Sequence, residues 1–381
     1  MINLAIPNLE GKEREYLNKC IDTTFVSSVG EYVNRFEDQV AKVTGSRYAV
    51  ATSSGTTGLH AALTAVGVKR DDLVIIPSFT FIATANAIAH CGAMPWLMDI
   101  REEDWCLDPE IVEAEIRYTC VLKDGALIHR EMGKRVAALM PVYTIGNLPD
   151  MKRFRRIADM YGIPLVADAA CAIGAKWQGE DFGSFADLSV LSFNGNKTVT
   201  CGGGGAVIGN DENLLKLVKH LTTTARVSKE YDFDMVGFNY RMTNLQAAVG
   251  CAQLERLDTF LSRKRFVRSY YESTFSDFGV SSFPATDMAS CWFSGVILPE
   301  GKGEEDVRDI CKKLADAGVE ARAFWKPVHL QKPYQSARIS AMRNTEAVWN
   351  RIITLPCSTG ITEEELKIVC DMVRIILKEH L

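Results

Sequence analysis

Short apolar runs alternate with amphipathic stretches of ten or more residues from about residue 48 to residue 220. The first amphipathic stretch places Leu59, Ala62, Leu63 and Val66 on one helical face, because these residues recur at i, i+3, i+4 and i+7. The strands that we expect are Tyr48–Thr52, Leu73–Pro77, Pro95–Asp99, Val136–Val142, Pro164–Ala167, Leu188–Phe193 and Ala206–Ile208. Strands that alternate with helices in this way predict an α/β fold with a mostly parallel central sheet.

The pattern changes after residue 243. The stretch from Thr243 to about Phe275 predicts one long helix, and Arg101–Arg135 predicts one helix with an irregular excursion. The remainder resembles a smaller α+β unit, with expected strands at Cys291–Leu298 and Val319–Phe324 and a closing helix around Leu366–Ile376. We therefore expect a large α/β domain over residues 1–250 and a small C-terminal α+β domain over residues 251–381.

Composition excludes several classes of protein. The net charge is −5 without any dense Lys/Arg block, which argues against nucleic-acid or anionic-membrane partners. No run of about 18 apolar residues predicts a membrane span, and the N-terminus does not resemble a signal peptide. The 11 cysteines are scattered without a Cys-x-x-Cys pair, so we expect reduced thiols in the cytoplasm and no metal site.

Five side chains with useful chemistry each follow the end of an expected strand. They are Ser54, Phe81, Asp168, Ser192 and Lys197. Ligands of parallel α/β sheets bind beyond the carboxyl ends of the strands. The sequence therefore predicts a site at this edge of the sheet.

Lys197 lies between the apolar run Leu188–Phe193 and four consecutive glycines, Gly202–Gly205. A lysine held at a cleft with little water can lose its proton, and the neutral amine can form a Schiff base with an aldehyde cofactor or a carbonyl substrate. The alternative is a solvated loop lysine, which is the more common environment of this residue type.

Pyridoxal phosphate (PLP) is an aldehyde cofactor whose requirements match the other strand-end residues. Gly55, Thr56 and Ser192 provide amides and hydroxyls for its phosphate, near a helix start. Asp168 provides a carboxylate for the ring nitrogen, and Phe81 a flat partner for the ring. The alternatives are helix or turn capping for the polar residues and core packing for the phenylalanine.

Six stretches of the sequence carry a family resemblance. They are SSGTTGLHAAL, PSFTFIATANAI, ADAACAIGA, SFNGNKTVTCGGGGA, VGFNYRMTNLQAAVG and WKPVHLQKPY. The chain resembles the DegT/DnrJ/EryC/StrS sugar aminotransferases from about residue 3 to about residue 360. The resemblance implies the aspartate-aminotransferase-like (type I PLP) three-layer fold. The GNK, GGGG and WKPVHLQ variants are most similar to the legionaminic-acid-pathway branch, whose enzymes aminate C4 of a UDP-linked 4-keto-6-deoxy-N-acetylhexosamine.

The resemblance also implies roles for individual residues. Lys197 would bond to the cofactor, Asp168 would pair with its ring nitrogen and Phe81 would stack on its ring, while Gly55, Thr56 and Ser192 would hold its phosphate. Asn239 would reach the phosphate of a neighbouring subunit, which implies a homodimer with shared active sites. Arg241 and His329 would face the sugar nucleotide or the amino donor, with Ser28 and Tyr334 as further candidates. The alternatives are a structural ion pair for Arg241 and a surface loop position for His329.

Two stretches depart from the family pattern. Cys171 occupies a cofactor-binding position, three residues after Asp168, where the family commonly has Gln, Glu or His. A thiol is a poor hydrogen-bond partner for the phenolic oxygen of the cofactor, so its ring is tuned differently. Tyr143–Gly146 replaces a histidine-bearing loop. Relatives that dehydrate their substrates carry His at the lysine position, so Lys197 favours transamination.

These observations predict a PLP-dependent aminotransferase with L-glutamate as the amino donor. The expected acceptor is the C4 keto group of a nucleotide-linked 4-keto-6-deoxy sugar, UDP-4-keto-6-deoxy-N-acetylhexosamine. The alternatives are amination of a GDP- or dTDP-linked keto sugar of the perosamine type and a non-catalytic protein with this fold.

Overall fold

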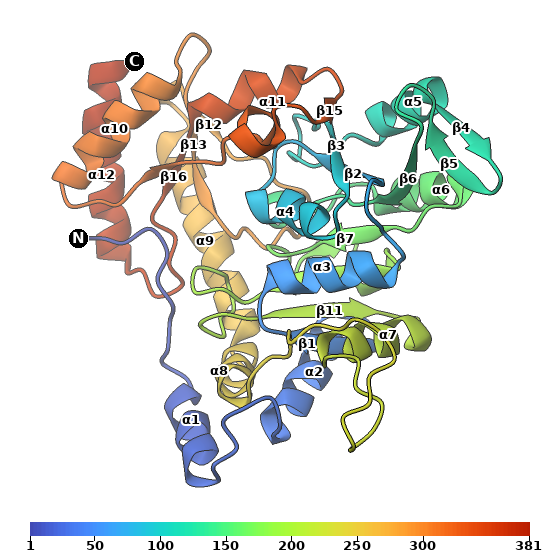
Figure 1. Ribbon diagram of the computed structural model, residues 1–381. Coiled ribbons are helices and arrows are strands. Elements are labelled where there is room, and N and C mark those ends of the chain that lie inside the picture. Colours follow the sequence, from blue (N-terminus) through green and yellow to red (C-terminus); the bar gives the residue numbers. More distant parts are fainter.

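The computed structural model describes residues 1–381 and contains two layered units connected by a long helix (Figure 1). The larger unit is built on a central sheet with the strand order β1-β11-β10-β7-β6-β2-β3, in which isolated bridges Leu139–Leu165 and Val142–Asp168 join β7 to β6. The strands are β1 (Tyr48–Thr52), β2 (Leu73–Pro77), β3 (Met94–Met98), β6 (Lys134–Leu139), β7 (Val166–Asp168), β10 (Leu188–Ser192) and β11 (Gly205–Gly209). All neighbours are parallel except β11, which is antiparallel to β1 and β10. The prediction of a mostly parallel sheet is confirmed.

Helices cover both faces of this sheet. One hydrophobic cluster contains side chains of α1, α2, α5, α6 and α8, and another contains side chains of α3, α4 and α7. These helices are α1 (Glu13–Asp22), α2 (Glu31–Thr44), α3 (Gly55–Ala65), α4 (Ile82–His90), α5 (Pro109–Thr119), α6 (Met151–Tyr161), α7 (Glu212–Thr222) and α8 (Asn244–Leu254). Along β2, Leu73 and Ile75 join the first cluster, whereas Val74 and Ile76 join the second. This alternation follows from the two-residue period of a strand and gives the three-layer fold that the sequence predicts.

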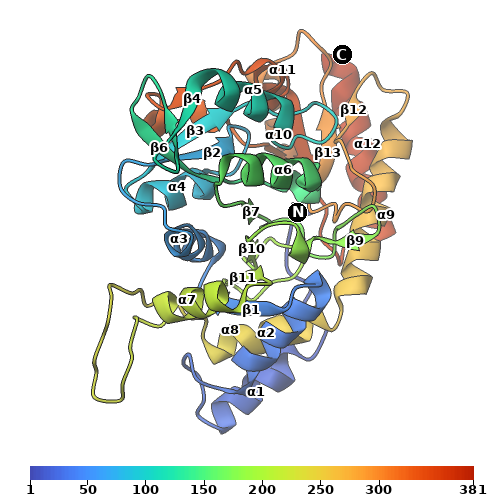
Figure 2. The same ribbon diagram turned by 90° about the vertical axis from the view of Figure 1, so that its right-hand side faces the viewer.

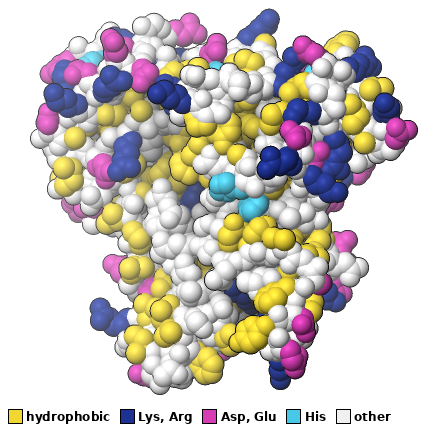
Figure 3. Space-filling model, in the orientation of Figure 1, with side chains coloured by type: hydrophobic (Ala, Val, Ile, Leu, Met, Phe, Trp, Pro, Cys, Tyr) yellow, Lys and Arg dark blue, Asp and Glu magenta, His cyan; other side chains and the backbone are white.

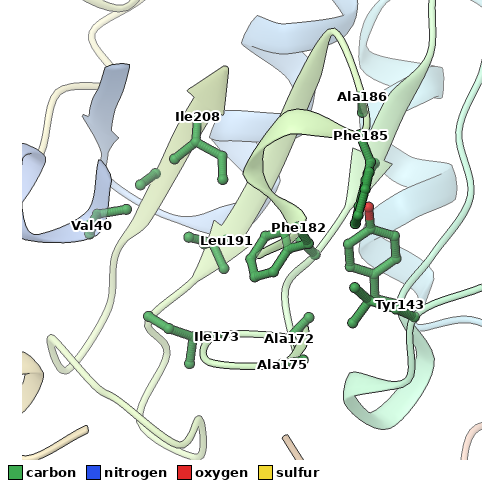
Figure 4. Packing of buried hydrophobic residues seen from close by; sticks show 14 of the residues in the cluster. Val40, Tyr143, Ala172, Ile173, Ala175, Phe182, Phe185, Ala186, Leu191 and Ile208 are labelled. Atoms are coloured by element: carbon green, nitrogen blue, oxygen red, sulfur yellow. The ribbon is translucent and has the colours of Figure 1, made fainter. Parts of the chain in front are cut away.

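The first cluster includes Tyr143, whose ring meets Phe182 edge-on with centroids 5.7 Å apart (Figure 4). Leu191 and Ile208 of the sheet lie in the same cluster beside Val40 of α2. Tyr143 is fully buried, and the Tyr143–Gly146 segment forms a buried turn. Tyr143 begins the segment that replaces the histidine-bearing loop of the family, and its side chain therefore belongs to the core of the large unit.

The smaller unit has an antiparallel sheet with the strand order β12-β13-β16-β14. Its elements are β12 (Ser281–Ser282), β13 (Ser294–Ile297), β14 (Arg322–Ala323), β16 (Ile352–Leu355), α9 (Leu257–Phe275), α10 (Glu304–Asp316) and α12 (Glu363–His380). The N-terminus also joins this unit, because Ile2 bridges Val319 and the Leu4 amide donates to Glu320. The central strand β16 is absent from our sequence prediction.

Two expected elements differ from the structure. The predicted helix over Thr243–Phe275 is interrupted at Glu255 and Arg256, where α8 ends in the large unit and α9 begins. The interruption coincides with long-range contacts, because the Glu255 carboxylate accepts from Arg35 and Tyr16, and Arg256 donates to Asn8 of the N-terminal segment. The expected excursion within Arg101–Arg135 contains α5 and a hairpin.

The hairpin consists of β4 (Cys120–Lys123) and β5 (Ala126–His129). Its two-residue turn, Asp124-Gly125, has positive φ at both residues, which Asp-Gly pairs favour in tight hairpins. The smaller elements are β8 (Lys176–Trp177), β9 (Glu180–Asp181), β15 (Arg338–Ile339), α11 (Arg343–Val348) and short 3₁₀ turns at Thr144–Gly146, Phe182–Ser184, Val328–Leu330, Lys332–Tyr334 and Trp349–Arg351. None of the helices is long and apolar enough to cross a membrane.

The segment between α7 and α8 projects from the body of the molecule as a long loop (Figure 2). It exposes several apolar side chains, including Tyr231, Phe233 and Val236. A polar loop between α1 and α2 likewise exposes Phe25 and Val29.

Candidate active site

A cavity of about 710 Å³ lies between the carboxyl ends of the large sheet and the small unit. Its lining includes six predicted site residues in addition to Lys197: Gly55, Thr56, Phe81, Asp168, Cys171 and Ser192. The small unit contributes aromatic and charged side chains from residues 292–325. Figure 3 shows a recess on this side of the molecule with hydrophobic side chains along it.

Lys197 enters the cavity from the turn after β10, where its amide donates to the carbonyl of Asn194. Its Nζ lies 3.2 Å from Cys171 Sγ and 3.7 Å from the centroid of the Trp292 ring. The side chain is half-buried and contacted on two sides. It is therefore held at a cleft and is not a solvated loop lysine.

Asp168 ends β7 and forms the bottom of the cavity, with 5% of its surface exposed. Thr84 Oγ1 donates to one carboxyl oxygen at 2.7 Å, and the Ala170 amide donates to the other at 3.1 Å. Burial raises the pKa of this carboxyl, while the two hydrogen bonds and the nearby Lys197 ammonium act in the opposite direction. A buried carboxylate of this kind is suited to a protonated ring nitrogen.

The start of α3 forms an anion cradle beside this carboxylate. Ser54 caps the helix by accepting from the amides of Thr57 and Gly58, through its side chain and carbonyl respectively. The amides of Gly55 and Thr56 are left outside the helical ladder, as at every helix start. A Cβ atom on Gly55 would lie 2.9 Å from the Ser192 Cβ, so glycine allows this close approach. The amides of Gly55 and Thr56 and the hydroxyls of Thr56 and Ser192 are suited to binding a phosphate.

Glycine is also required on the neighbouring strand. A Cβ atom on Gly205 would lie 2.4 Å from the carbonyl oxygen of Ser54. The glycine run after Lys197 thus lets β11 pass directly beneath the start of α3, which brings the lysine and the anion cradle together.

Aromatic side chains form the wall of the cavity. Phe81 is 55% exposed and lies outside the core, with its ring centroid 6.1 Å from that of Trp325. Trp325 in turn stacks on Phe324 at 4.4 Å and lies 5.9 Å from Trp292. The aromatic wall therefore extends from Phe81, the predicted partner of the cofactor ring, to Trp292, whose ring lies over the Lys197 amine.

Cys171 is the second close neighbour of the Lys197 amine, beside Trp292. Burial raises the pKa of its thiol, an effect that the Lys197 ammonium partly offsets. The thiol is therefore a neutral neighbour of the lysine amine at neutral pH.

His329 and Tyr334 lie outside the cavity lining. Ser78 Oγ is 2.7 Å from His329 Nδ1, and burial lowers the pKa of this imidazole. The Tyr334 hydroxyl donates to Asn86 Oδ1 at 2.7 Å. Both side chains pack the segment between β14 and β15 against the large unit.

Three other predicted residues also lie outside the cavity of this chain: Ser28, Asn239 and Arg241. Arg241 forms an ion pair with Glu37 at 3.2 Å, and both side chains are close to 10% exposed. This is the structural ion pair that the sequence left open. Asn239 lies at the base of the projecting loop, where it bridges Thr223, and Ser28 is exposed.

Sequence reasoning missed several lining residues. Thr84 lies three residues after Phe81 on the first turn of α4, so its position relative to Asp168 had a local signal. Trp325 opens the WKPVHLQKPY stretch, but that motif gave it no role. Trp292 and Arg322 had no signal, because only the packing of the small unit brings them to the cavity.

Comparison with known proteins places this geometry in context. The profile of the DegT/DnrJ/EryC1/StrS aminotransferase family matches residues 7–374. The GDP-perosamine synthase of Caulobacter vibrioides is 36% identical over 371 residues, covering 96% of this chain and 95% of that protein. The UDP-4-amino-4,6-dideoxy-N-acetyl-β-L-altrosamine transaminase of Campylobacter jejuni is 28% identical, covering 100% of this chain and 98% of that protein.

A similar fold occurs in a solved sugar aminotransferase from Streptococcus pneumoniae in its PMP form. The TM-score is 0.89 at 22% identity, with 100% of each chain covered. This likeness supports the type I PLP fold of the chain.

Proposed function

Because the chain belongs to the DegT/DnrJ/EryC1/StrS aminotransferase family, we propose that it moves an amino group from L-glutamate to the C4 keto group of a nucleotide-linked 4-keto-6-deoxy sugar. The enzyme is a PLP-dependent aminotransferase. The observation that carries the proposal is one cavity that contains the Lys197 amine, the Asp168 carboxylate and the anion cradle at Gly55.

The residues present fit PLP. Gly55, Thr56 and Ser192 would hold its phosphate, Asp168 its ring nitrogen and Phe81 one face of its ring. PLP supplies an aldehyde that accepts an amine and a ring that withdraws electrons from the substrate carbon. Lys197 would bond to this aldehyde and, once released, would move a proton at the substrate carbon as general acid and base. The buried Asp168 would keep the ring nitrogen protonated by remaining ionised beside it.

Replacing Lys197 tests this assignment. Lys197→Ala should lower turnover by about 10⁴-fold, because both the covalent link and the proton carrier are lost. The measurement is 2-oxoglutarate release, together with the mass of borohydride-reduced protein, which should no longer retain the cofactor. Lys216→Ala is a control, since Lys216 is an exposed lysine paired with Glu212. Full turnover in Lys197→Ala would refute the mechanism.

For the acceptor, we propose UDP-4-keto-6-deoxy-N-acetylhexosamine, supported by the WKPVHLQ motif and by the likeness to the Campylobacter transaminase. A GDP-linked 4-keto-6-deoxy sugar is a second candidate, favoured by the higher identity to a GDP-perosamine synthase. Measuring kcat/KM with UDP-, GDP- and dTDP-linked keto sugars separates them. A higher kcat/KM for the UDP sugar supports the first candidate, and a higher value for the GDP sugar selects the second.

We also propose a cytoplasmic homodimer with shared active sites. All 11 cysteines are free, as in a reducing compartment. Asn239 lies outside the cavity of its own chain, at the base of a loop that exposes Tyr231, Phe233 and Val236. Apolar side chains gathered on a projecting loop favour burial against another chain. Sedimentation velocity tests the dimer, and monomeric protein with full activity would contradict it.

A further inference from the structure

A buried ammonium group lies next to the cavity without a carboxylate partner. Lys264 of α9 is 3% exposed, and its Nζ donates to the carbonyl oxygens of Trp292 at 2.8 Å and Cys357 at 2.7 Å. No ion pair in the chain includes this lysine. Buried lysines are rare, and a buried amine whose partners are two carbonyl oxygens and the Cys357 sulfur requires a close and fixed geometry.

Trp292, whose carbonyl accepts from Lys264, is anchored by two further hydrogen bonds. The Trp292 amide donates to Ile145 O at 3.1 Å, and its indole Nε1 donates to Asn196 O at 2.8 Å. Cys291, the preceding residue, has φ of 54°, a strained conformation for a residue with a side chain. Both the backbone and the ring of Trp292 are thus fixed. The ring is bonded to Asn196, in the turn that carries Lys197.

This anchored indole is in contact with the reacting amine. Its centroid lies 3.7 Å from Lys197 Nζ, and Cys171 Sγ lies 3.2 Å from the same atom. A lysine side chain has four rotatable bonds, so a free Lys197 amine would sample many positions. Contact with a ring face and with a thiol limits the positions open to the amine, and the ring face attracts the amine when it is charged.

We propose that Trp292 fixes the Lys197 amine in its reacting position, and that Lys264 is a positioning residue that acts through Trp292. The small unit thereby positions the Lys197 amine. The five residues that follow strand ends all belong to the large unit. The inference rests on the proposed function in one respect, namely that Lys197 is the nucleophile. It does not depend on which sugar is the acceptor.

The first measurement is steady-state kinetics of Trp292→Leu and Lys264→Met. Loss of geometric control of a reacting group by about 1 Å can lower rates by about 10²-fold, so we expect kcat to fall about 10- to 100-fold. The KM for glutamate should change less than about threefold, because the substrate contacts remain. Arg263→Met is the matched control, since Arg263 precedes Lys264 on α9 and donates to the distant carbonyl of Ile361. It should leave kcat unchanged.

The second measurement does not require catalysis. Apoprotein is mixed with PLP, reduced with borohydride at successive times, and analysed for the cofactor-labelled peptide that contains Lys197. Labelling should be about 10-fold slower in both variants than in the wild type and in Arg263→Met. Normal labelling of both variants would overturn the proposal. Labelling of the wild type without amination of any keto sugar would instead refute only the proposed substrate.

A double-mutant cycle separates positioning from a general effect on the fold. If Trp292 acts through Lys197, Trp292→Leu should cause no further loss in the slow glutamate half-reaction of Lys197→Ala, followed by cofactor absorbance. Equal losses in both backgrounds would show that the ring acts elsewhere and would overturn the proposal. If Lys264→Met does not fold, Lys264→Arg and Trp292→Phe replace the two variants. Wild-type kcat and labelling rate in both of these would count against the proposal.

Discussion

The floor and the roof of the cavity are built differently. The floor consists of Asp168, Ser192, Lys197 and the start of α3, which are polar groups at the ends of strands in the large unit. The roof consists of Trp292, Phe324, Trp325 and Arg322, which come from the small unit. The floor thus carries the groups that we propose to bind and activate a cofactor, whereas the roof offers mainly ring faces. This difference suggests that the floor determines the reaction, whereas the roof positions the Lys197 amine through Trp292 and the substrate through Trp325.

The rate loss in Asp168→Asn should be the largest of the three effects that test this comparison. The substitution keeps the shape of the floor but removes the charge that would stabilise a protonated ring nitrogen. Loss of one preorganised electrostatic partner lowers rates by about 10²- to 10³-fold, and we expect a loss of this size in kcat for both half-reactions. Stopped-flow absorbance measures each half-reaction. The control is Asp181→Asn, which alters a carboxylate outside the cavity that pairs with Lys176. A loss confined to the sugar half-reaction would break the division between floor and roof.

Trp325→Ala should have a smaller and more selective effect. The ring lies between Phe81 and Trp292, and therefore beside the place where a sugar carbon would meet Lys197. An aromatic contact is worth about 0.5–1.5 kcal/mol, so the KM for the sugar nucleotide should rise about 2- to 12-fold. The glutamate half-reaction should keep its rate, and Trp325→Phe should recover most of the sugar affinity. Equal losses in both half-reactions would assign Trp325 to the floor.

The smallest effect concerns the stability of the apoprotein. Burial raises the pKa of Asp168 above its unfolded value, so its stabilising contribution is complete below the unfolded pKa and is lost as the pH rises through the folded pKa. Asn does not titrate. The unfolding free energy of Asp168→Asn should therefore increase relative to that of the wild type as the pH rises from the unfolded pKa of this carboxyl through its raised folded pKa. Urea unfolding of apoprotein at several pH values measures this difference. If the difference in unfolding free energy between Asp168→Asn and the wild type did not change with pH, ionisation of the buried Asp168 would not destabilise the folded protein.

The floor could be predicted from the sequence because its signals are local. Each residue directly follows an apolar strand, and parallel strands bring their carboxyl ends to one edge. Helical and strand periods are properties of short windows and predicted the α/β layering with a mostly parallel sheet, whereas the three-layer arrangement came from the family resemblance. The same periods merged α8 and α9 because apolar positions continue across Glu255 and Arg256, whereas the break depends on contacts with Tyr16 and Arg35 in distant segments.

The roof could not be predicted in this way. Trp292 lies 95 residues after Lys197 in the numbering, and its neighbours Cys291 and Phe293 give no sign of a ligand site. Its position depends on the buried Lys264 within the small unit and on a hydrogen bond to Asn196, which forms only when the two units pack together. The strand β16 was missed for a similar reason, because its four residues pair in the middle of a sheet whose partners are far apart in sequence.

The N-terminal segment gives a practical consequence for handling the enzyme. Leu4 and Ala5 line the cavity, and the Leu4 amide is tied to Glu320, whose other oxygen holds Arg322 of the roof. A purification tag fused ahead of Met1, or trimming of the first few residues by a protease, would therefore disturb the cavity wall at Leu4 and Ala5 and the Glu320–Arg322 pair. Leu381 is half exposed and remote from these contacts, so the carboxyl end is the safer attachment point for tags and surface immobilisation.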